Sequence, residues 1–296
     1  MLTTRVVGVV LSCLVVSGAA RADDRARSED RPSTVRWSRG WTRVGALDYA
    51  GITAGIGATA LVTFRLSPRE QERFGGGVAF DDAVRGLLRI RSPAWRGRAD
   101  SVSDVTWYAT MLYPFVGDAL IAAGIVHGNA DVAWQLTVTN VAAYLLTGIV
   151  TRLGENLIGR RRPAVYACDG NTAGSCAKAG RTQSFPSGHT ALAFTAAGLT
   201  CAHHENLPLL GGGAPDTAAC GVTLGLAAIT GVLRVMADRH WASDVAVGAG
   251  LGLVVGYGLP HLTRYAVGDD RWLDLPLMLM PSLAPDNVGA VVAGAF

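Results

Sequence analysis

Six apolar stretches, each close to the length that crosses a lipid bilayer, constrain the fold of this chain more than any other feature. They occupy residues 47–66, 105–126, 132–153, 188–203, 218–236 and 243–262. A membrane-spanning helix needs about 20 apolar residues, and the small residues in these stretches let helix backbones approach closely. The sequence therefore predicts an all-α fold, a six-helix bundle that is embedded in a membrane or associated with one.

The composition agrees with helices that are buried or face lipid. Half of the 296 residues are hydrophobic and 17% are charged, whereas about a quarter of the residues in a typical soluble domain are charged. The formal net charge of +3 gives no sign of the strongly basic surface that binds nucleic acid. Three polar residues interrupt the apolar stretches and should face the bundle interior: Asp118, Gln135 and Asn140.

The N-terminal 22 residues have the pattern of an export signal. Arg5 precedes an apolar stretch that is short for a span, and Ala20-Arg21-Ala22 fits a small-x-small cleavage site. An uncleaved first span is the alternative. We therefore expect a signal peptide at 1–22, a flexible polar arm at 23–45, a helical domain at 46–264, and a C-terminal tail at 265–296 that forms a short β-hairpin or is irregular.

Export would allow disulfide bonds. Cys168 and Cys176 lie in one polar loop, and Cys201 and Cys220 flank another. Either pair could bridge, and buried free thiols are the alternative. Between the first two apolar stretches, residues 80–90 predict an amphipathic helix, which would rest on a membrane surface or on the surface of the protein.

The segment Pro186-Ser187-Gly188-His189 stands where a polar loop meets an apolar stretch. Proline and serine suit a helix start, where free backbone N–H groups favour an anion. Gly188 lets a phosphate come close to the backbone, and His189 would stand beside that phosphate. A capped helix with an incidental histidine is the alternative.

A second segment reads Arg234-x5-His240-x3-Asp244. If His240 and Asp244 share a helical turn, they lie on one face, and the carboxylate takes the proton of one ring nitrogen. The other nitrogen is then free to act as a nucleophile. A helix cap for Asp244 and a surface histidine are the alternatives.

A third segment, Glu155-x6-Arg162-Pro163, follows the third apolar stretch. Arginine suits a bidentate contact with phosphate, and Pro163 ends the helix so that Arg162 projects from it. Taken alone, this segment is better interpreted as a basic helix end that complements the helix dipole.

In an antiparallel bundle all three segments fall at the same end, because they end the third helix, begin the fourth, and join the fifth to the sixth. Two histidines, a carboxylate and arginines in one place predict cleavage of a phosphate ester without a metal or other cofactor. His203-His204-Glu205 suggests a metal site, but it falls at the other end of the bundle without a spaced partner ligand.

In these motifs the chain resembles the type 2 phosphatidic acid phosphatase superfamily. That superfamily includes bacterial lipid phosphatases, class A non-specific acid phosphatases and vanadium haloperoxidases. Its pattern is Lys-x6-Arg-Pro, then Pro-Ser-Gly-His, then Ser-Arg-x5-His-x3-Asp, and the resemblance covers residues 155–244. Six helices in this order fit its membrane-bound branch.

The resemblance implies a role for each matching residue. His240 would be the nucleophile that becomes phosphohistidine, Asp244 would orient it, and His189 would be the general acid. The phosphate would be held by Arg162, Arg234, Ser187 and Gly188.

Two positions depart from the superfamily pattern, since Glu155 replaces its lysine and Leu233 its serine. Glu155 and Arg162 are seven residues apart and share a helix face, so the carboxylate would repel a phosphate unless it is paired. Arg152 or Arg161 could pair with it; otherwise the site is weakened, or the substrate carries a positive group. A further possibility, which we favour, is that nearby arginines replace the lost cation.

The residues and the resemblance together predict a phosphatase that hydrolyses a phosphomonoester or diphosphate, on a phospholipid or polyprenyl phosphate, through phosphohistidine. The alternatives are a soluble periplasmic acid phosphatase, a vanadate-binding haloperoxidase, and a catalytically silent membrane protein that binds a lipid phosphate. A cleaved signal followed by six spans would put the active face in the cytoplasm, whereas a Cys168–Cys176 bridge and the resemblance favour the outside. We expect an exported inner-membrane protein with a periplasmic active face, with a soluble periplasmic protein as the alternative.

Overall fold

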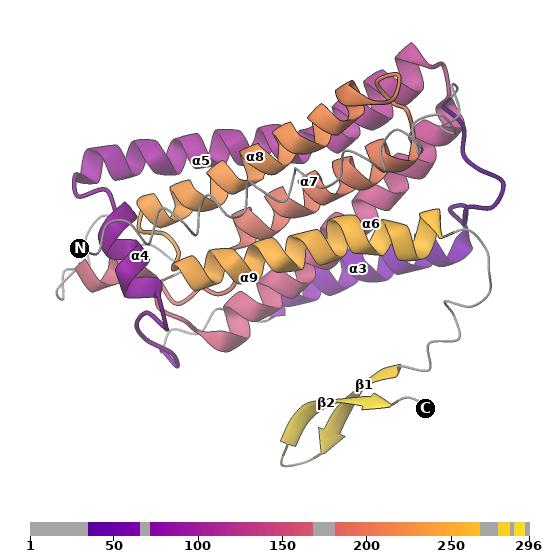
Figure 1. The fold of residues 1–296 in the computed structure, drawn as a ribbon. Helices are drawn as coiled ribbons and strands as arrows, with labels where there is room; N and C mark the ends of the chain where they lie inside the picture. The colour runs from indigo at the N-terminus through magenta and orange to yellow at the C-terminus, as the bar shows by residue number, and fades with distance from the viewer. Residues whose placement is uncertain (1–34, 66–71, 168–180, 267–277, 285–286, 294–296) are drawn as a thin grey trace.

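A computed structural model describes residues 35–65, 72–167, 181–266, 278–284 and 287–293. Long helices lie side by side in a bundle (Figure 1). Near the C-terminus, β1 (Met278–Ala284) and β2 (Asn287–Ala293) pair as antiparallel strands where the sequence predicts a hairpin. The predicted signal peptide at 1–22 lies outside the described residues, and so do Cys168 and Cys176.

Each of the six predicted apolar stretches is a helix. In chain order the helices are α3 (Ala46–Arg65), α5 (Pro93–Tyr113) with its continuation η2 (Pro114–Val126), α6 (Ala130–Ile158), α7 (Gly188–Asn206), α8 (Ala214–Met236), and α9 (Ala242–Leu253) with η5 (Val254–Gly258) and η6 (His261–Tyr265). Two shorter elements are α4 (Asp81–Leu88), where the sequence predicts an amphipathic helix, and the 3-10 turn η3 (Pro163–Ala167). The all-α fold class is confirmed, and α4 makes the helix count larger than six.

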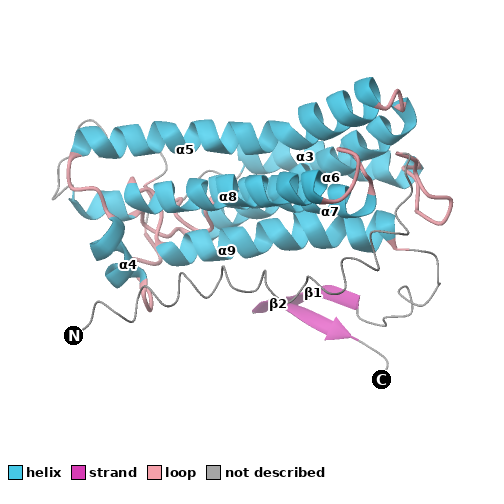
Figure 2. Ribbon diagram, turned by 45° about the horizontal axis from the view of Figure 1, so that its top comes forward, coloured by secondary structure: helices cyan, strands magenta, loops and turns pink. Residues whose placement is uncertain are grey.

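Helix α7 lies in the middle of the bundle and contacts α5, α6, α8 and α9 (Figure 2). Glycine permits its close packing against the last helix. A Cβ atom at Gly248 would lie 2.7 Å from the backbone oxygen of Ser187, and one at Gly198 would lie 2.7 Å from the backbone nitrogen of Tyr257. Larger residues would push the two helices apart. The start of α7 is therefore held firmly against α9.

The bundle is apolar outside and carries polar groups inside, which is the distribution expected in lipid. Among the residues that the structure describes, five helices are long and apolar enough to cross a bilayer: α3, α5–η2, α6, α8 and α9–η6. Their exposed side chains include Phe64, Ile125, Val222 and Val254. The polar residues Asp118, Gln135 and Asn140 are buried, as the sequence predicts. The chain is therefore a membrane protein.

Residues 35–45 differ from the flexible arm that the composition predicts. Val35 and Trp37 are buried in one apolar cluster with Leu136 and other residues of the bundle. The backbone N–H of Thr42 also donates a hydrogen bond to the carbonyl of Arg264, at 3.1 Å. Two apolar side chains in a polar segment are enough to hold it against the bundle, and average composition conceals them.

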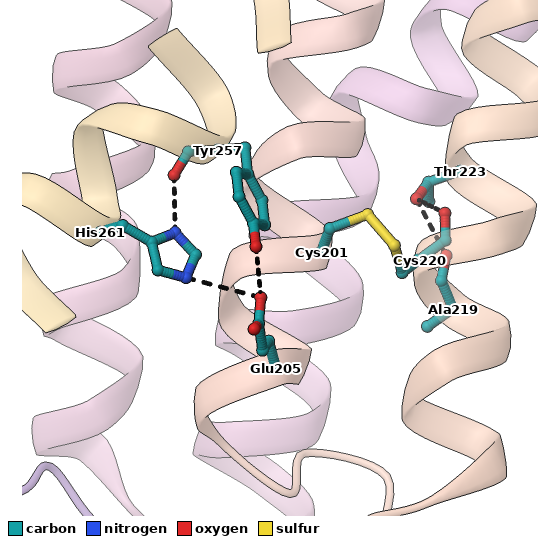
Figure 3. Close-up of a disulfide and its surroundings, with 7 residues drawn as sticks. All are labelled: Cys201, Glu205, Ala219, Cys220, Thr223, Tyr257 and His261. Atoms are coloured by element: carbon teal, nitrogen blue, oxygen red, sulfur yellow. Dashed lines mark hydrogen bonds and ion pairs between the residues drawn. A yellow bond between two sulfur atoms is a disulfide. The ribbon is translucent and has the colours of Figure 1, made fainter. Parts of the chain in front are cut away.

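Cys201 of α7 and Cys220 of α8 form a disulfide bond (Figure 3). Cys201 lies 13 residues after Gly188, which is about 20 Å along a helix. We call this end of the bundle, where α7 leads to α8, the opposite end. We call the other end, where α6 finishes and α7 begins, the site end.

Buried Arg160 ties three segments together at the site end. Its Nη1 donates to Asp244 of α9 at 2.5 Å, and its Nη2 donates to Asp81 of α4 at 2.7 Å. Asp81 also accepts hydrogen bonds from the backbone N–H and the hydroxyl of Ser243, both at 2.7 Å. Burial raises the pKa of Asp81, but these hydrogen bonds outweigh burial and hold that pKa below its ordinary value. Asp81 therefore stays ionised beside Arg160.

Replacing Arg160 by Met would leave two buried carboxylates without their common cation. Removing one member of a buried ion pair costs about 3–5 kcal/mol, so we expect a large fall in the thermal unfolding temperature of the purified protein in detergent. Arg161→Met is the matched control, because part-exposed Arg161 pairs with Glu72 at 3.3 Å and such pairs contribute about 0–1 kcal/mol. Equal unfolding temperatures for the two variants would contradict this role of Arg160.

Candidate active site

The structure brings the three predicted segments together at the site end. Arg162 lies in the turn after α6, Ser187 and His189 lie at the start of α7, and His240 lies in the connection between α8 and α9. A backbone hydrogen bond joins two of the segments, since the N–H of Ser187 donates to the carbonyl of Asp244 at 3.1 Å. Residues that are far apart in sequence thus form one site.

His240 is buried, and one hydrogen bond fixes its ring. Nδ1 lies 2.7 Å from the backbone oxygen of Ser184. A carbonyl oxygen can only accept, so Nδ1 carries the proton and Nε2 keeps its lone pair. Burial lowers the pKa of His240 well below its ordinary value, and the charges of Arg162 and Arg234 lower it further. At neutral pH the ring is therefore uncharged, and Nε2 has the electronic state of a nucleophile.

Asp244 does not bond directly to His240, which differs from the predicted orientation of the ring by this carboxylate. Its Oδ2 lies 3.9 Å from His240 Nδ1, too far for a hydrogen bond. The same oxygen accepts from the hydroxyl of Ser184 at 2.6 Å and from the backbone N–H of Trp241 at 2.9 Å. Asp244 thus holds Ser184, and Ser184 holds the ring. Ser184 was not predicted as a site residue, because it contacts His240 through its backbone carbonyl, and every residue type has that group.

Two arginines place positive charge beside the histidines. Arg162 Nε donates to the carbonyl of Gln183 at 3.2 Å. Arg234 is buried, and its Nη1 donates to Asp100 at 2.8 Å and to Ser103 at 3.1 Å. Arg234 Nε has no hydrogen-bond partner within the described part of the chain. A buried guanidinium with an unused N–H group is suited to bind an anion.

The start of α7 adds backbone donors. Ser187 is the N-cap residue, and its hydroxyl lies 2.9 Å from the hydroxyl of Thr190. The first N–H groups of a helix have no partner within that helix, and together with the helix dipole they favour an anion. Ser187 and Gly188 therefore lie at a helix start, which is the position predicted for them from the Pro-Ser-Gly-His segment.

Glu155, which replaces the superfamily lysine, borders the same helix start. A Cβ atom at Gly188 would lie 3.5 Å from Glu155 Oε1. The other carboxylate oxygen accepts a hydrogen bond from Arg152 at 3.0 Å. Of the two predicted partners, Arg152 is the one in contact, whereas Arg161 pairs with Glu72. The charge of Arg152 therefore offsets the negative charge that Glu155 brings to the site.

Helix α5 supplies further contacts to the site, which were not predicted from the sequence. Asp100 and Asp104 both contact Arg234, at 2.8 Å and 3.5 Å. Asp104 Oδ1 also lies 3.2 Å from His189 Nε2. Both aspartates precede the apolar stretch at 105–126, so the hydropathy pattern assigns them to a polar insert. Because α5 begins at Pro93, they lie within this helix, in about its third and fourth turns, and reach the site.

The segment His203-His204-Glu205 lies at the opposite end, as the sequence predicts. His204 sits between two carboxylates, with Nε2 3.0 Å from Asp118 and Nδ1 2.5 Å from Asp216. His203 Nδ1 lies 2.8 Å from the hydroxyl of Tyr265. These contacts join η2, α7, α8 and η6. Among the residues that the structure describes, no group of three or more His, Cys, Asp or Glu side chains is arranged to hold a metal ion.

Comparison with known proteins points to the same region of the chain. Residues 133–267 match the model of the PAP2 superfamily. Over 177 residues the chain is 32% identical to the lipid A 1-phosphatase of Porphyromonas gingivalis, a match that covers 60% of this chain and 33% of that protein. The chain thus spans about a third of the length of this curated relative.

A solved structure is also similar, that of a transmembrane PAP2 type phosphatidylglycerolphosphate phosphatase from Bacillus subtilis. The TM-score is 0.47 at 16% identity, and the match covers 72% of this chain and 94% of that chain.

The region that matches the superfamily model runs from α6 through η6. It contains all three segments that meet at the site end: the Arg162 turn, the start of α7, and the connection that carries His240. Residues 133–267 of the chain are therefore similar to the PAP2 superfamily.

Proposed function

We propose that this protein is a lipid phosphatase that transfers a phosphoryl group to His240 and then to water. The observation that carries the proposal is the state of His240. Its protonated Nδ1 is held by the carbonyl of Ser184, so Nε2 is left as a neutral nucleophile. The neighbouring charges of Arg162 and Arg234 suit a phosphate dianion, and a nucleophile beside an anion site is the arrangement that phosphoryl transfer requires.

In the first step, Nε2 of His240 attacks phosphorus and forms an N–P bond while the P–O bond to the lipid breaks. The leaving oxygen takes a proton from His189, which acts as general acid. Arg162 and Arg234 stabilise the charge on the phosphoryl oxygens, with the N–H groups at the start of α7 as further donors. The product of this step is a phosphohistidine and a free lipid alcohol, or a lipid monophosphate if the substrate is a diphosphate.

In the second step, water attacks the phosphohistidine and the N–P bond breaks. His189, now without its proton, takes a proton from the attacking water. The products are inorganic phosphate and the starting form of His240. The Nδ1–H group of His240 donates to the carbonyl of Ser184, which Asp244 holds in place, and this bond stabilises the positive charge that the ring carries in the phosphohistidine.

A lipid substrate is favoured over a soluble one because the site lies at one end of a bundle whose outer surface is apolar. A phosphate on a lipid headgroup would reach this end from the membrane surface. The similarity to a lipid A 1-phosphatase supports lipid-linked phosphates as the class of substrate. Phosphatidic acid, phosphatidylglycerophosphate, a polyprenyl diphosphate and lipid A form the panel to test.

His240→Ala should lower phosphate release from the preferred lipid by at least about a hundredfold, because it removes the nucleophile. The measurement is inorganic phosphate released from each lipid of the panel in detergent micelles. An unchanged unfolding temperature would show that the variant is folded. If the wild-type protein binds these lipids but releases no phosphate from any of them, the chain is a silent lipid-phosphate-binding protein instead.

Glu155→Lys should leave kcat/KM unchanged or raise it, because it restores a positive charge beside the phosphate. Glu155→Gln is the matched variant that removes the negative charge without adding a positive one. Its kcat/KM should lie between those of the wild-type protein and Glu155→Lys. A collapse of activity in both variants would mean that the glutamate has a catalytic or substrate-binding role of its own.

The orientation proposed from the sequence has the active face in the periplasm, and two structural observations favour the reverse. The Cys201–Cys220 disulfide lies toward the opposite end, and disulfides persist on the oxidising side of a membrane. Arginines gather at the site end in the segment from α4 to the start of α5, and positive charge favours the cytoplasmic side. Both observations would place the site end in the cytoplasm.

Labelling of exposed cysteines tests the two orientations. Arg91→Cys marks the site end and Arg39→Cys marks the opposite end, each in a chain in which Cys168 and Cys176 are replaced by Ser. If the disulfide and the arginines decide the topology, a membrane-impermeant maleimide labels Arg39→Cys in intact spheroplasts and labels Arg91→Cys only after lysis. The reverse pattern would support the periplasmic active face.

A further inference from the structure

One face of α5 contacts the active site, although α5 lies outside the region that matches the superfamily model. Asp100, Ser103, Asp104 and Trp107 follow the spacing i, i+3, i+4 and i+7, which places them on one side of a helix. Each of them contacts a residue of the site. Because all four side chains contact site residues, this face is part of the site and is not simply a charged surface exposed to water.

The contacts on this face divide into two sets. Asp100 pairs with Arg234 at 2.8 Å and also with Arg239, so it holds the arginines. Asp104 instead lies 3.2 Å from Nε2 of His189, and its contact with Arg234 is longer, at 3.5 Å.

Trp107 completes the environment of His189. Its ring centroid lies 4.4 Å from that of His189, with the ring planes tilted by 46°. The indole limits how the imidazole can turn, while the Asp104 carboxylate contacts one of its nitrogens. His189 is thus held by α5 rather than by residues of its own helix, and Nδ1 is the ring nitrogen that does not contact Asp104.

We propose that Asp104 is a positioning residue for the general acid, and that α5 therefore contributes a carboxylate–histidine pair to catalysis. This inference rests on the proposed phosphatase function. In the first step the proton on Nδ1 of His189 moves to the leaving oxygen as the P–O bond breaks. In the second step Nδ1 takes a proton from water. The Asp104 carboxylate stabilises the imidazolium before the first transfer and after the second, and it fixes which nitrogen faces the reaction.

If Asp104 acts through the general acid His189, the effect of substituting Asp104 on kcat/KM should depend on the leaving group. A lipid alkoxide needs a proton as it departs, whereas p-nitrophenolate leaves without one. Asp104→Asn keeps an oxygen that can accept from His189 but removes its negative charge. We expect kcat/KM for the lipid phosphate to fall by about 10-fold or more, and kcat/KM for p-nitrophenyl phosphate to fall by less than about threefold. The ratio kcat/KM is used because it reports the first phosphoryl transfer and not the later hydrolysis.

Asp100→Asn is the matched control on the same helix face. Asp100 contacts Arg234 and Arg239, so its loss should weaken phosphate binding for both esters alike. We expect a raised KM with the same proportional change for the lipid phosphate and for p-nitrophenyl phosphate.

A double-mutant cycle on the lipid phosphate gives an independent measurement. If Asp104 acts through His189, Asp104→Asn should have little further effect in a His189→Ala background. Multiplying effects of the two substitutions would overturn the proposal, as would equal losses for the two esters in Asp104→Asn. A failure of the proposed function itself would look different, because wild-type protein and His240→Ala would then release phosphate equally slowly.

Discussion

The buried contact between Arg160 and two aspartates is the interaction on which the site depends. One guanidinium group satisfies Asp81 of α4 and Asp244 of α9, and it sits in the turn that follows α6. Asp244 in turn holds the hydroxyl of Ser184, and the Ser184 carbonyl fixes the ring of His240. The tautomer of His240 is thus set through a chain of contacts that begins at the buried charge of Arg160.

The site balances its positive and negative charges within the protein. Arg234 is paired with carboxylates of α5, and Glu155 is paired with Arg152. Buried guanidinium groups without partners would be costly in an apolar bundle, so the carboxylates keep them in place when phosphate is absent. If the site binds a phosphate dianion as proposed, the same carboxylates restrict where it binds, because it must approach the N–H groups that they leave unused. Arg234 Nε is one such group.

The opposite end of the bundle is held by a different set of bonds. A disulfide joins α7 to α8, and buried His204 lies between carboxylates of η2 and α8. Polar groups in an apolar bundle are stable only when they bond to one another. These bonds fix the relative positions of the helices, which apolar contacts with lipid cannot do. The central helix α7 is therefore held at both of its ends.

The sequence by itself determined the six long helices, the meeting of three motif segments at one end, and the inward direction of Asp118, Gln135 and Asn140. Hydropathy and helical spacing are local properties, and helix packing in an antiparallel bundle follows from them. Only the tertiary structure showed that Ser184 and not Asp244 hydrogen-bonds to His240, that Arg152 pairs with Glu155, and that α5 reaches the site. These outcomes depend on the relative rotation and depth of packed helices. A difference of a few ångströms, which no residue pattern specifies, decides which of several possible partners lies within hydrogen-bonding distance.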